Sequence, residues 1–216
     1  MNERTGEGPM VDSTVDVNRM PRIEPLLYEE VDEKTRQAWD ELRPPPGGPT
    51  QKPGQEHDLF RIGMHHPDLM RVHQPFVQFV KNSTVLPIRH RELAIMRSAW
   101  LGGVDDQFVN HTKIGMECGL ARDEIDRIPA GADAPGWSAE DAAILRAVDE
   151  LHFSCRISDH TWADLARQYD DRQLLELLLL VGNYRTLSYL QNSIGIRPVT
   201  GNSPNIPGNH FLFLGA

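Results

Sequence analysis

The chain has 216 residues, a length that suits one or two domains and can bury a core without disulfides. Charged residues make up 25% of the chain and apolar residues 39%, which is ordinary for a soluble globular protein. The formal net charge of −9 and the absence of a basic stripe argue against a nucleic-acid partner.

The N-terminal part of the sequence predicts a tail, a helix and a connector. Residues 1–20 are polar and lack periodicity, which is typical of a flexible tail. Apolar residues recur at helical spacing over residues 25–43, where we expect a helix. The following "RPPPGGPTQKPG" cannot continue it, because proline lacks the backbone donor. We expect a solvated connector there, with a lid over a site as the alternative.

The rest of the chain has the pattern of an all-α protein. From Asp58 onward the spacing predicts helices over 66–82, 87–101, 105–118, 138–153, 158–169 and 171–195. Asp105 and Ser138 are the expected N-caps of two of these helices, and Gly119 follows the end of one. The last helix is apolar on most sides, as expected of a central buried helix. No strand alternation is present, so we predict a single all-α domain over residues 21–197.

The C-terminal residues 198–216 are predicted to form an irregular tail. They are rich in Pro, Gly and Asn but end in the apolar "FLFL". An apolar end on an irregular segment predicts docking, either on its own domain or on a neighbouring subunit.

Cysteine use and hydropathy predict a cytoplasmic protein. The two cysteines, Cys118 and Cys155, form no CxxC pair, which is typical of reduced thiols in the cytosol. No apolar run follows a basic N-terminal patch, so no signal peptide is indicated. The longest apolar run, "LLELLLLVG", contains Glu176 and is too short to span a bilayer.

A glutamate and a histidine on successive predicted helices form the candidate site. Gln107 and His111 share one face of their helix, and Glu92 lies on an apolar face of the preceding helix. The short "GGV" turn would bring the two faces together. A buried carboxyl group beside an imidazole can move a proton near neutral pH. The alternative, which periodicity alone favours, is a structural pair, or Glu92 paired with Arg89 or Arg97.

The segment "PIRHRELAIMRSAWLGGVDDQFVNHTKIGMECGLARDEIDRI" resembles the core of the carboxymuconolactone decarboxylase-like family, which includes AhpD-type alkylhydroperoxidases. The resemblance rests on a Glu in "REL", a turn, a helix carrying His, and a "GL…EI" segment, and it covers roughly residues 22–197. Glu92 and His111 match the family's Glu and His. Val104 and Gln107 stand where the peroxidase branch carries the two cysteines of CxxC.

This resemblance implies an AhpD-like helical bundle, assembled as a homotrimer or homohexamer, with the active site near the Glu–His cluster. The peroxidase cycle needs an attacking thiolate and a resolving thiol, which Val104 and Gln107 cannot supply. Cys118 has no resolving partner in sequence, so a thiol peroxidase is disfavoured. The decarboxylase-like branch needs no thiols and no cofactor, since its chemistry is proton transfer next to an electron sink.

We therefore expect a cofactor-independent lyase acting on a small carboxylate-bearing, aromatic-derived metabolite. His111 would be the principal acid and base, with Glu92 orienting it. The alternatives are an isomerase of the same substrate class and a non-catalytic member that binds small acids.

Five further residues are candidates for contacting the substrate. Gln107 would donate a hydrogen bond or orient the imidazole, and Phe108 would form an apolar wall. Arg97 would grip a carboxylate, while Asn183 and Tyr184 would reach the pocket from the last helix. Packing or ion pairing is the alternative for these last three.

The remaining histidines predict no metal site. His65, His66 and His73 lie close in sequence, but nothing matches HExxH and no carboxylate completes a ligand set.

Overall fold

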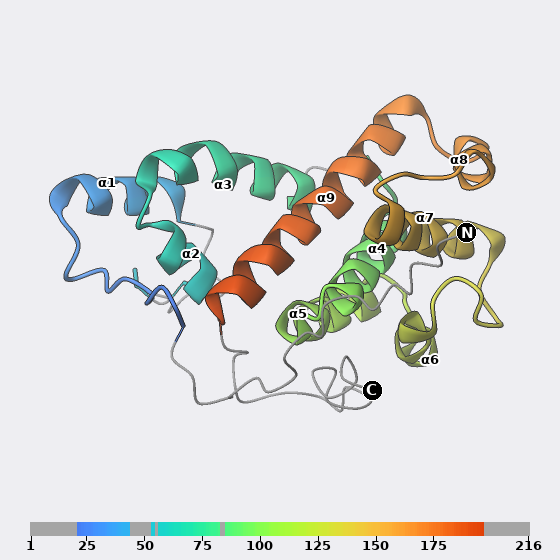
Figure 1. Ribbon diagram of the computed structural model, residues 1–216, viewed down its shortest axis with the longest axis horizontal. Helices are drawn as coiled ribbons and strands as arrows, with labels where there is room; N and C mark the ends of the chain where they lie inside the picture. The colour runs from blue at the N-terminus through green and yellow to red at the C-terminus, as the bar shows by residue number, and fades with distance from the viewer. Residues whose placement is uncertain (1–20, 44–52, 55, 83–84, 197–216) are drawn as a thin grey trace, which may run out of the picture.

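The computed structural model describes residues 21–43, 53–54, 56–82 and 85–196, which are helical and contain no strand (Figure 1). The predicted all-α class is confirmed. The helices are α1 (Glu33–Leu42), α2 (Asp58–Gly63), α3 (Pro67–Asn82), α4 (Ile88–Leu101), α5 (Asp105–Glu117), α6 (Arg122–Arg127), the 3-10 helix η1 (Ile128–Ala130), α7 (Ala139–Ser154), α8 (Asp159–Ala166) and α9 (Asp171–Ile194).

Helices α1, α2 and α3 gather at one end of the molecule, and α6, α7 and α8 at the other (Figure 1). The first end has a small apolar core of its own, built around the fully buried Trp39 and Met64. The larger core lies around α4. A hydrogen bond of 2.8 Å between His57 Nε2 and Asp106 Oδ2 ties the entry of α2 to the first turn of α5.

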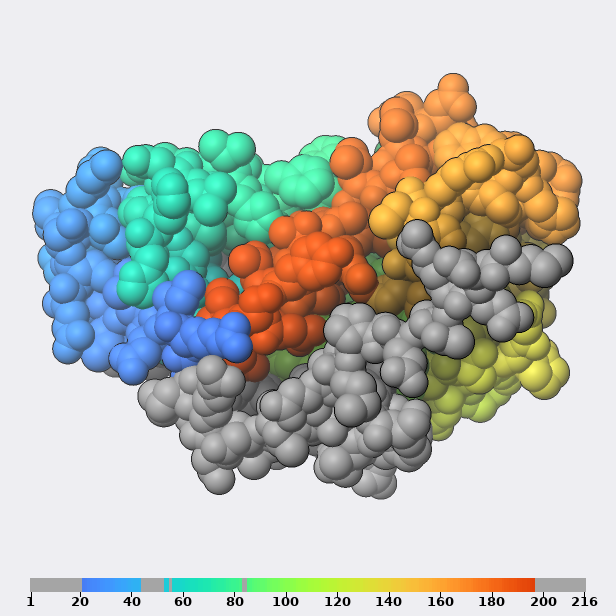
Figure 2. Space-filling view, in the orientation of Figure 1, coloured from blue at the N-terminus to red at the C-terminus, as the bar shows by residue number. Residues whose placement is uncertain are grey.

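Helix α4, not α9, is the central helix. Every residue of α4 from Glu92 to Ala99 is buried, because α5, α7 and α9 all pack against it. Helix α9 instead exposes Leu175, Leu179 and Tyr189, and Figure 2 shows its outer side open to solvent. The expectation of a central last helix was therefore wrong. Both α4 and α9 are rich in apolar residues. Only the packing of the other helices around them determines which of the two is buried.

Local capping follows the sequence closely, with one exception. The Ser138 hydroxyl accepts from the Asp141 N–H, as predicted for an N-cap. Gly119 has φ +91° beyond the end of α5, the left-handed conformation that glycine adopts most readily. The predicted cap at Asp105 was wrong, because Val104 is the N-cap and Asp105 already lies in the first helical turn. A carboxylate in that turn still stabilises the positive end of the helix.

The N-terminal helix is shorter than predicted. Helix α1 begins at Glu33, where the Asp32 side chain accepts from the Thr35 N–H at 2.7 Å. The predicted tails, 1–20 and 198–216, lie outside the described residues, as does most of the connector. Where the chain is described, no helix is long and apolar enough to cross a membrane.

Candidate functional site

The Gly102–Gly103 turn brings α9 against the junction of α4 and α5. A Cβ atom at Gly102 would collide with the Ser188 side chain of α9, so glycine permits the close approach. The Gly102 carbonyl accepts from Asn192 Nδ2 at 2.6 Å, which fixes this approach. Gly103 has φ +64°, which lets the chain reverse into α5. The "GGV" turn therefore positions three helices.

His111 of α5 lies between a carboxylate and a phenol. Its Nδ1 lies 2.7 Å from Glu92 Oε2 on α4, and its Nε2 lies 3.0 Å from the Tyr184 hydroxyl on α9. Because a carboxylate only accepts, Nδ1 carries the proton in this contact. The side chain of Glu92 is 1% exposed and that of His111 is 9% exposed. The predicted approach of Glu92 to His111 is therefore present, and Tyr184 joins them.

The second oxygen of Glu92 is bound by a residue that the sequence did not indicate. Arg91 Nε and Nη2 each lie 3.1 Å from Glu92 Oε1. Adjacent helical residues point in different directions, so periodicity offers no signal for this pair. The expected alternative partners, Arg89 and Arg97, are bound elsewhere. Arg91, Glu92, His111 and Tyr184 form one chain of contacts, which we call the relay.

Tyr184 is neutral within the relay. Burial and the negative charge of Glu92 both raise the pKa of the Tyr184 hydroxyl well above its ordinary value. Its ring packs edge-on against His111, with ring centroids 5.4 Å apart at 80°. When the imidazole is neutral, the Tyr184 O–H donates to Nε2. When the imidazole is protonated, Nε2–H donates to the hydroxyl oxygen, and the phenolic proton is free to point elsewhere.

Two buried carboxamides lie one helical turn or less from the relay in sequence. Gln107 is one turn before His111 on α5, and Asn183 directly precedes Tyr184 on α9. Both residues are buried, yet Gln107 Oε1 and Asn183 Oδ1 have no hydrogen-bond partner among the described residues. A buried polar atom left unpaired costs about 1–3 kcal/mol, so such groups usually have a ligand or water to bind.

The thiols are poorly suited to nucleophilic chemistry. Burial raises the pKa of Cys118, and the negative charge of Glu92 raises it further, so the thiolate is disfavoured. Cys155 is exposed and ends α7 in a left-handed conformation, with φ 53°. Both cysteines are free.

Phe108 and Arg97 take structural positions. Phe108 packs edge-on against Trp100 within the main core. Arg97 Nε donates to Asp149 Oδ1 at 2.6 Å, and its Nη1 donates to the carbonyls of Ile128 and Pro129, both at 2.9 Å. The structure brings Tyr184 to His111 but ties Arg97 to η1 and α7.

The N-terminal histidines make local contacts. His65 Nε2 bonds the Glu24 carbonyl, and His66 Nδ1 accepts from the Leu69 N–H. No group of three or more His, Cys, Asp or Glu side chains in the described part of the chain could hold a metal ion.

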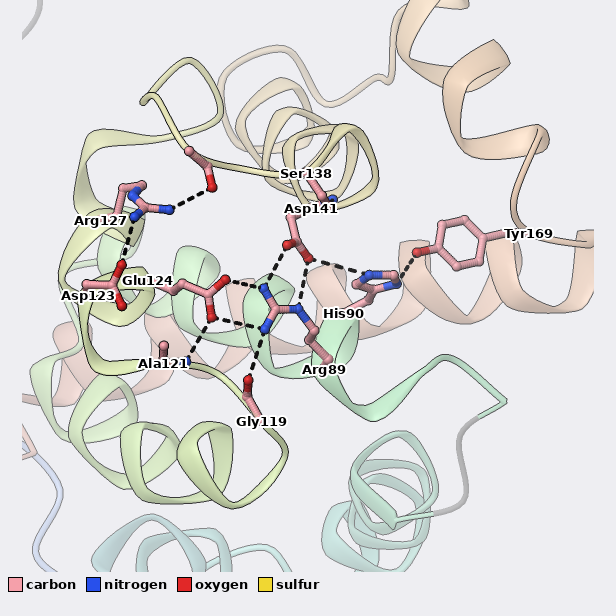
Figure 3. Close-up of polar contacts among 11 residues, drawn as sticks. Arg89, His90, Gly119, Ala121, Asp123, Glu124, Arg127, Ser138, Asp141 and Tyr169 are labelled. Atoms are coloured by element: carbon pink, nitrogen blue, oxygen red, sulfur yellow. Dashed lines mark hydrogen bonds and ion pairs between the residues drawn. The ribbon is translucent and has the colours of Figure 1, made fainter.

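A second polar cluster starts two residues earlier on α4, at Arg89 and His90 (Figure 3). Arg89 binds Glu124 of α6 through Nη2 at 2.6 Å and Asp141 of α7 through Nη2 at 2.7 Å. His90 Nε2 lies 3.5 Å from Asp141 Oδ1, and its Nδ1 contacts the Tyr169 hydroxyl. We call these five residues the Arg89 network.

Ion pairing controls the charges of the Arg89 network. Burial alone would raise the pKa of Asp141, but hydrogen bonds from His90 and Arg89 outweigh it and hold that pKa well below the ordinary value. The hydrogen bonds that Arg89 donates to Glu124 and Asp141 raise the pKa of its guanidinium. The network holds α4 to α6 and α7 through the ion pairs of Arg89.

No family model matches the sequence, and a search of curated proteins finds no match. Solved structures do match. A protein of unknown function from Agrobacterium tumefaciens, provisionally assigned as the antioxidant-defence protein AhpD, is 15% identical with a TM-score of 0.57, covering 66% of this chain and 96% of its own. An AhpD-core peroxidase-related protein from Ralstonia eutropha is 13% identical with a TM-score of 0.59, covering 92% of this chain and 98% of its own.

The debrominase Bmp8 is also similar, at 12% identity and a TM-score of 0.60, covering 82% of this chain and 92% of its own. A cysteine-to-alanine variant of that enzyme has been solved in complex with 2,3,4-tribromopyrrole. At these identities the likeness shows the fold alone. The AhpD-like fold predicted from the core segment is confirmed, and this fold serves at least one enzyme.

Proposed function

We propose that this protein is a cofactor-independent lyase that acts by proton transfer on a small carboxylate-bearing, aromatic-derived metabolite. One observation carries the proposal: the buried His111 imidazole is held between the Glu92 carboxylate and the Tyr184 hydroxyl. A histidine oriented by a carboxylate on one nitrogen, with a hydroxyl that can exchange a proton at the other, can act as a general acid and base.

Each residue of the relay has a role in the proposed proton transfer. Loss of CO₂ leaves the electron pair of the broken C–C bond in an extended enolate, whose carbon must then be protonated. Tyr184 would give its hydroxyl proton to that carbon while the His111 imidazolium returns a proton to the phenolic oxygen. Glu92, held by Arg91, stabilises the imidazolium. Because Tyr184 occupies Nε2, Tyr184 is the group that meets the substrate, with His111 behind it.

Gln107 and Asn183 supply the hydrogen bonds that orient the substrate. Their carboxamides are buried, and Gln107 Oε1 and Asn183 Oδ1 have no partner among the described residues. Amide oxygens accept hydrogen bonds, so they suit the hydroxyl or protonated carboxyl groups of a substrate. Arg91 is the positive group of the relay, and it replaces Arg97 as the candidate for attracting a carboxylate, since Arg97 is bound to Asp149. Phe108 contributes through packing.

Two alternatives share this site. An isomerase of the same substrate class would use the same proton transfer without loss of CO₂. A non-catalytic protein that binds small acids is favoured by one observation, the occupation of both His111 nitrogens. A cytoplasmic location and a trimeric or hexameric assembly remain predictions from the sequence.

The test is turnover of carboxymuconolactone-type lactones in D₂O by the full chain and by His111→Ala. The control is His66→Ala, because His66 is exposed and lies outside the relay. We expect CO₂ release with deuterium at the protonated carbon for the wild type and control, and a fall of about 10²–10⁴-fold for His111→Ala.

Deuterium uptake without CO₂ would identify the isomerase. Equal rates for the wild type and His111→Ala would remove the catalytic assignment. Thermal stabilisation by small acids without turnover would identify the binding protein, at about 2.7 kcal/mol for ligand at a hundredfold its dissociation constant.

A further inference from the structure

The solvent-exposed face of α3 is apolar along three turns. Every exposed residue between positions 69 and 79 is apolar, and we call these five residues the α3 stripe: Leu69, Val72, Pro75, Phe76 and Phe79. A surface helix normally presents charged and polar side chains to water. Helix α3 therefore has apolar residues on both its inner and its outer face.

The stripe lies on the face of α3 opposite the described helices that pack against it. The inner face of α3 buries Met70 and Val80 and packs against α1, α2 and α9. On the outer face Val72 is 75% exposed, Leu69 57% and Phe79 53%, so these side chains are largely uncovered. A contiguous exposed apolar patch of this kind marks a protein contact.

We propose that the α3 stripe is a two-fold contact with a second copy of this chain, in which α3 packs antiparallel against the same helix. The spacing supports this occupant. Successive large members of the stripe, Leu69, Val72, Phe76 and Phe79, are separated by three, four and three residues, so the stripe is the same in both directions about position 74. An antiparallel partner places Leu69 opposite the partner's Phe79 and Val72 opposite the partner's Phe76, pairing smaller with larger side chains.

The charges at the two ends of α3 support the same orientation. Asp68 lies in the first turn, where it also pairs with Arg71 of its own helix at 2.9 Å. Lys81 lies in the last turn, and both residues are exposed. An antiparallel pair brings Asp68 near the partner's Lys81 twice, and it opposes the two helix dipoles favourably. A parallel pair would bring like charges together.

The proposed contact requires a two-fold axis. The trimer or hexamer that the family resemblance implies does not by itself specify one. A trimer by itself contains no two-fold axis, whereas a dimer, or a hexamer built from two trimers, does. The inference rests on the surface of α3 and does not depend on the chemistry proposed for the relay.

The first test is the mass of the full chain by light scattering, compared with Val72→Glu and with Phe153→Glu as a control. Phe153 is 73% exposed but lies on α7, outside the stripe. We expect an even multiple of the 24.4 kDa chain for the wild type and control, and half that mass for Val72→Glu. A monomeric wild type, or a mass that Val72→Glu leaves unchanged, overturns the proposal.

The second test fixes the orientation by cross-linking single cysteines in a Cys118→Ser, Cys155→Ser background. Antiparallel packing places the two copies of position 75 about 3 Å apart along the helix axis, but the two copies of position 69 about 15 Å apart. A short bismaleimide should therefore link Pro75→Cys and not Leu69→Cys. Equal linking at both positions indicates parallel packing and overturns the proposal.

The third test exchanges the end charges. Asp68→Lys and Lys81→Asp should each weaken association by about two- to fivefold per pair, and the double variant should restore it. Additive weakening in the double variant contradicts the antiparallel pairing.

Discussion

Two clusters built from the same types of residue begin on α4, one at Arg89 and the other at Arg91. Each contains arginine, carboxylate, histidine and tyrosine, with the histidine between a carboxylate and a phenol. In the Arg89 network one arginine binds two carboxylates, and every charge has an opposite partner (Figure 3). In the relay, the single carboxylate of Glu92 is shared by Arg91 and His111.

This difference separates a structural cluster from a candidate catalytic one. The Arg89 network joins three helices, and Arg89 and Glu124 also bond the backbone of Gly119 and Ala121. Gln107 and Asn183 lie close to relay residues in sequence, and their buried oxygens have no partner in the described part of the chain. Side-chain type alone therefore does not indicate catalysis, because unused hydrogen-bonding capacity beside the histidine is what distinguishes the two clusters.

The largest expected difference is in kcat, between variants of the tyrosines of the two clusters. Tyr184→Phe removes the hydroxyl that we propose contacts the substrate and should lower kcat by about 10²–10⁴-fold. Tyr169→Phe removes the equivalent hydroxyl beside His90 and should leave kcat unchanged, with a stability loss of about 1 kcal/mol. Steady-state kinetics and urea unfolding of both variants check this pair. Equal losses of kcat would contradict the distinction between the clusters.

The next difference concerns stability. Asp141→Ala leaves Arg89 and His90 without their shared carboxylate and should lower the free energy of unfolding by about 3–5 kcal/mol. Glu92→Gln keeps a polar group of the same shape in the relay and should cost less stability while lowering activity. Urea midpoints, measured together with turnover, separate the two effects. A larger stability loss from Glu92→Gln than from Asp141→Ala would indicate that the relay, and not the Arg89 network, is the structural cluster.

Acid should unfold the protein partly through the Arg89 network. The pKa of Asp141 is lower in the folded chain than its unfolded value of about 3.9, so the folded state binds fewer protons there. The stability that Asp141 contributes is present above that value and is lost as the pH falls toward the folded pKa. Urea midpoints of the wild type should fall below about pH 4 more steeply than those of Asp141→Ala. Parallel pH profiles would count against this contribution.

The smallest effect on stability is expected from His152, which lies outside both clusters. Burial and the charge of Arg185, whose Nη1 lies 2.7 Å from His152 Nδ1, lower the pKa of His152 to about 4. The unfolded value is about 6.5, so stability from neutral His152 is present above that pH and is lost between about 6.5 and 4. Thermal melting should show a decline over this range that His152→Gln flattens. An unchanged slope would show that His152 is not responsible.

Local features of the sequence predicted the helices well. Ser138 and Gly119 act at short range, through bonds to residues three or four positions away, so their roles can be read before the fold is known. The approach of Glu92 to His111 was also predictable, because a short turn joins two helices whose faces are defined by spacing. The central position of α4 was not predictable, because burial depends on what packs around a helix.

The sequence by itself determined the all-α class, most helix boundaries and the pairing of Glu92 with His111, since these depend on spacing within about twenty residues. Only the tertiary structure decided that Tyr184 binds Nε2 of His111, that Arg91 holds Glu92, and that Arg97 is bound to Asp149. The two contacts with Tyr184 and Asp149 join residues more than fifty positions apart. The third joins neighbours that helical spacing points apart, and side-chain packing alone brings them together.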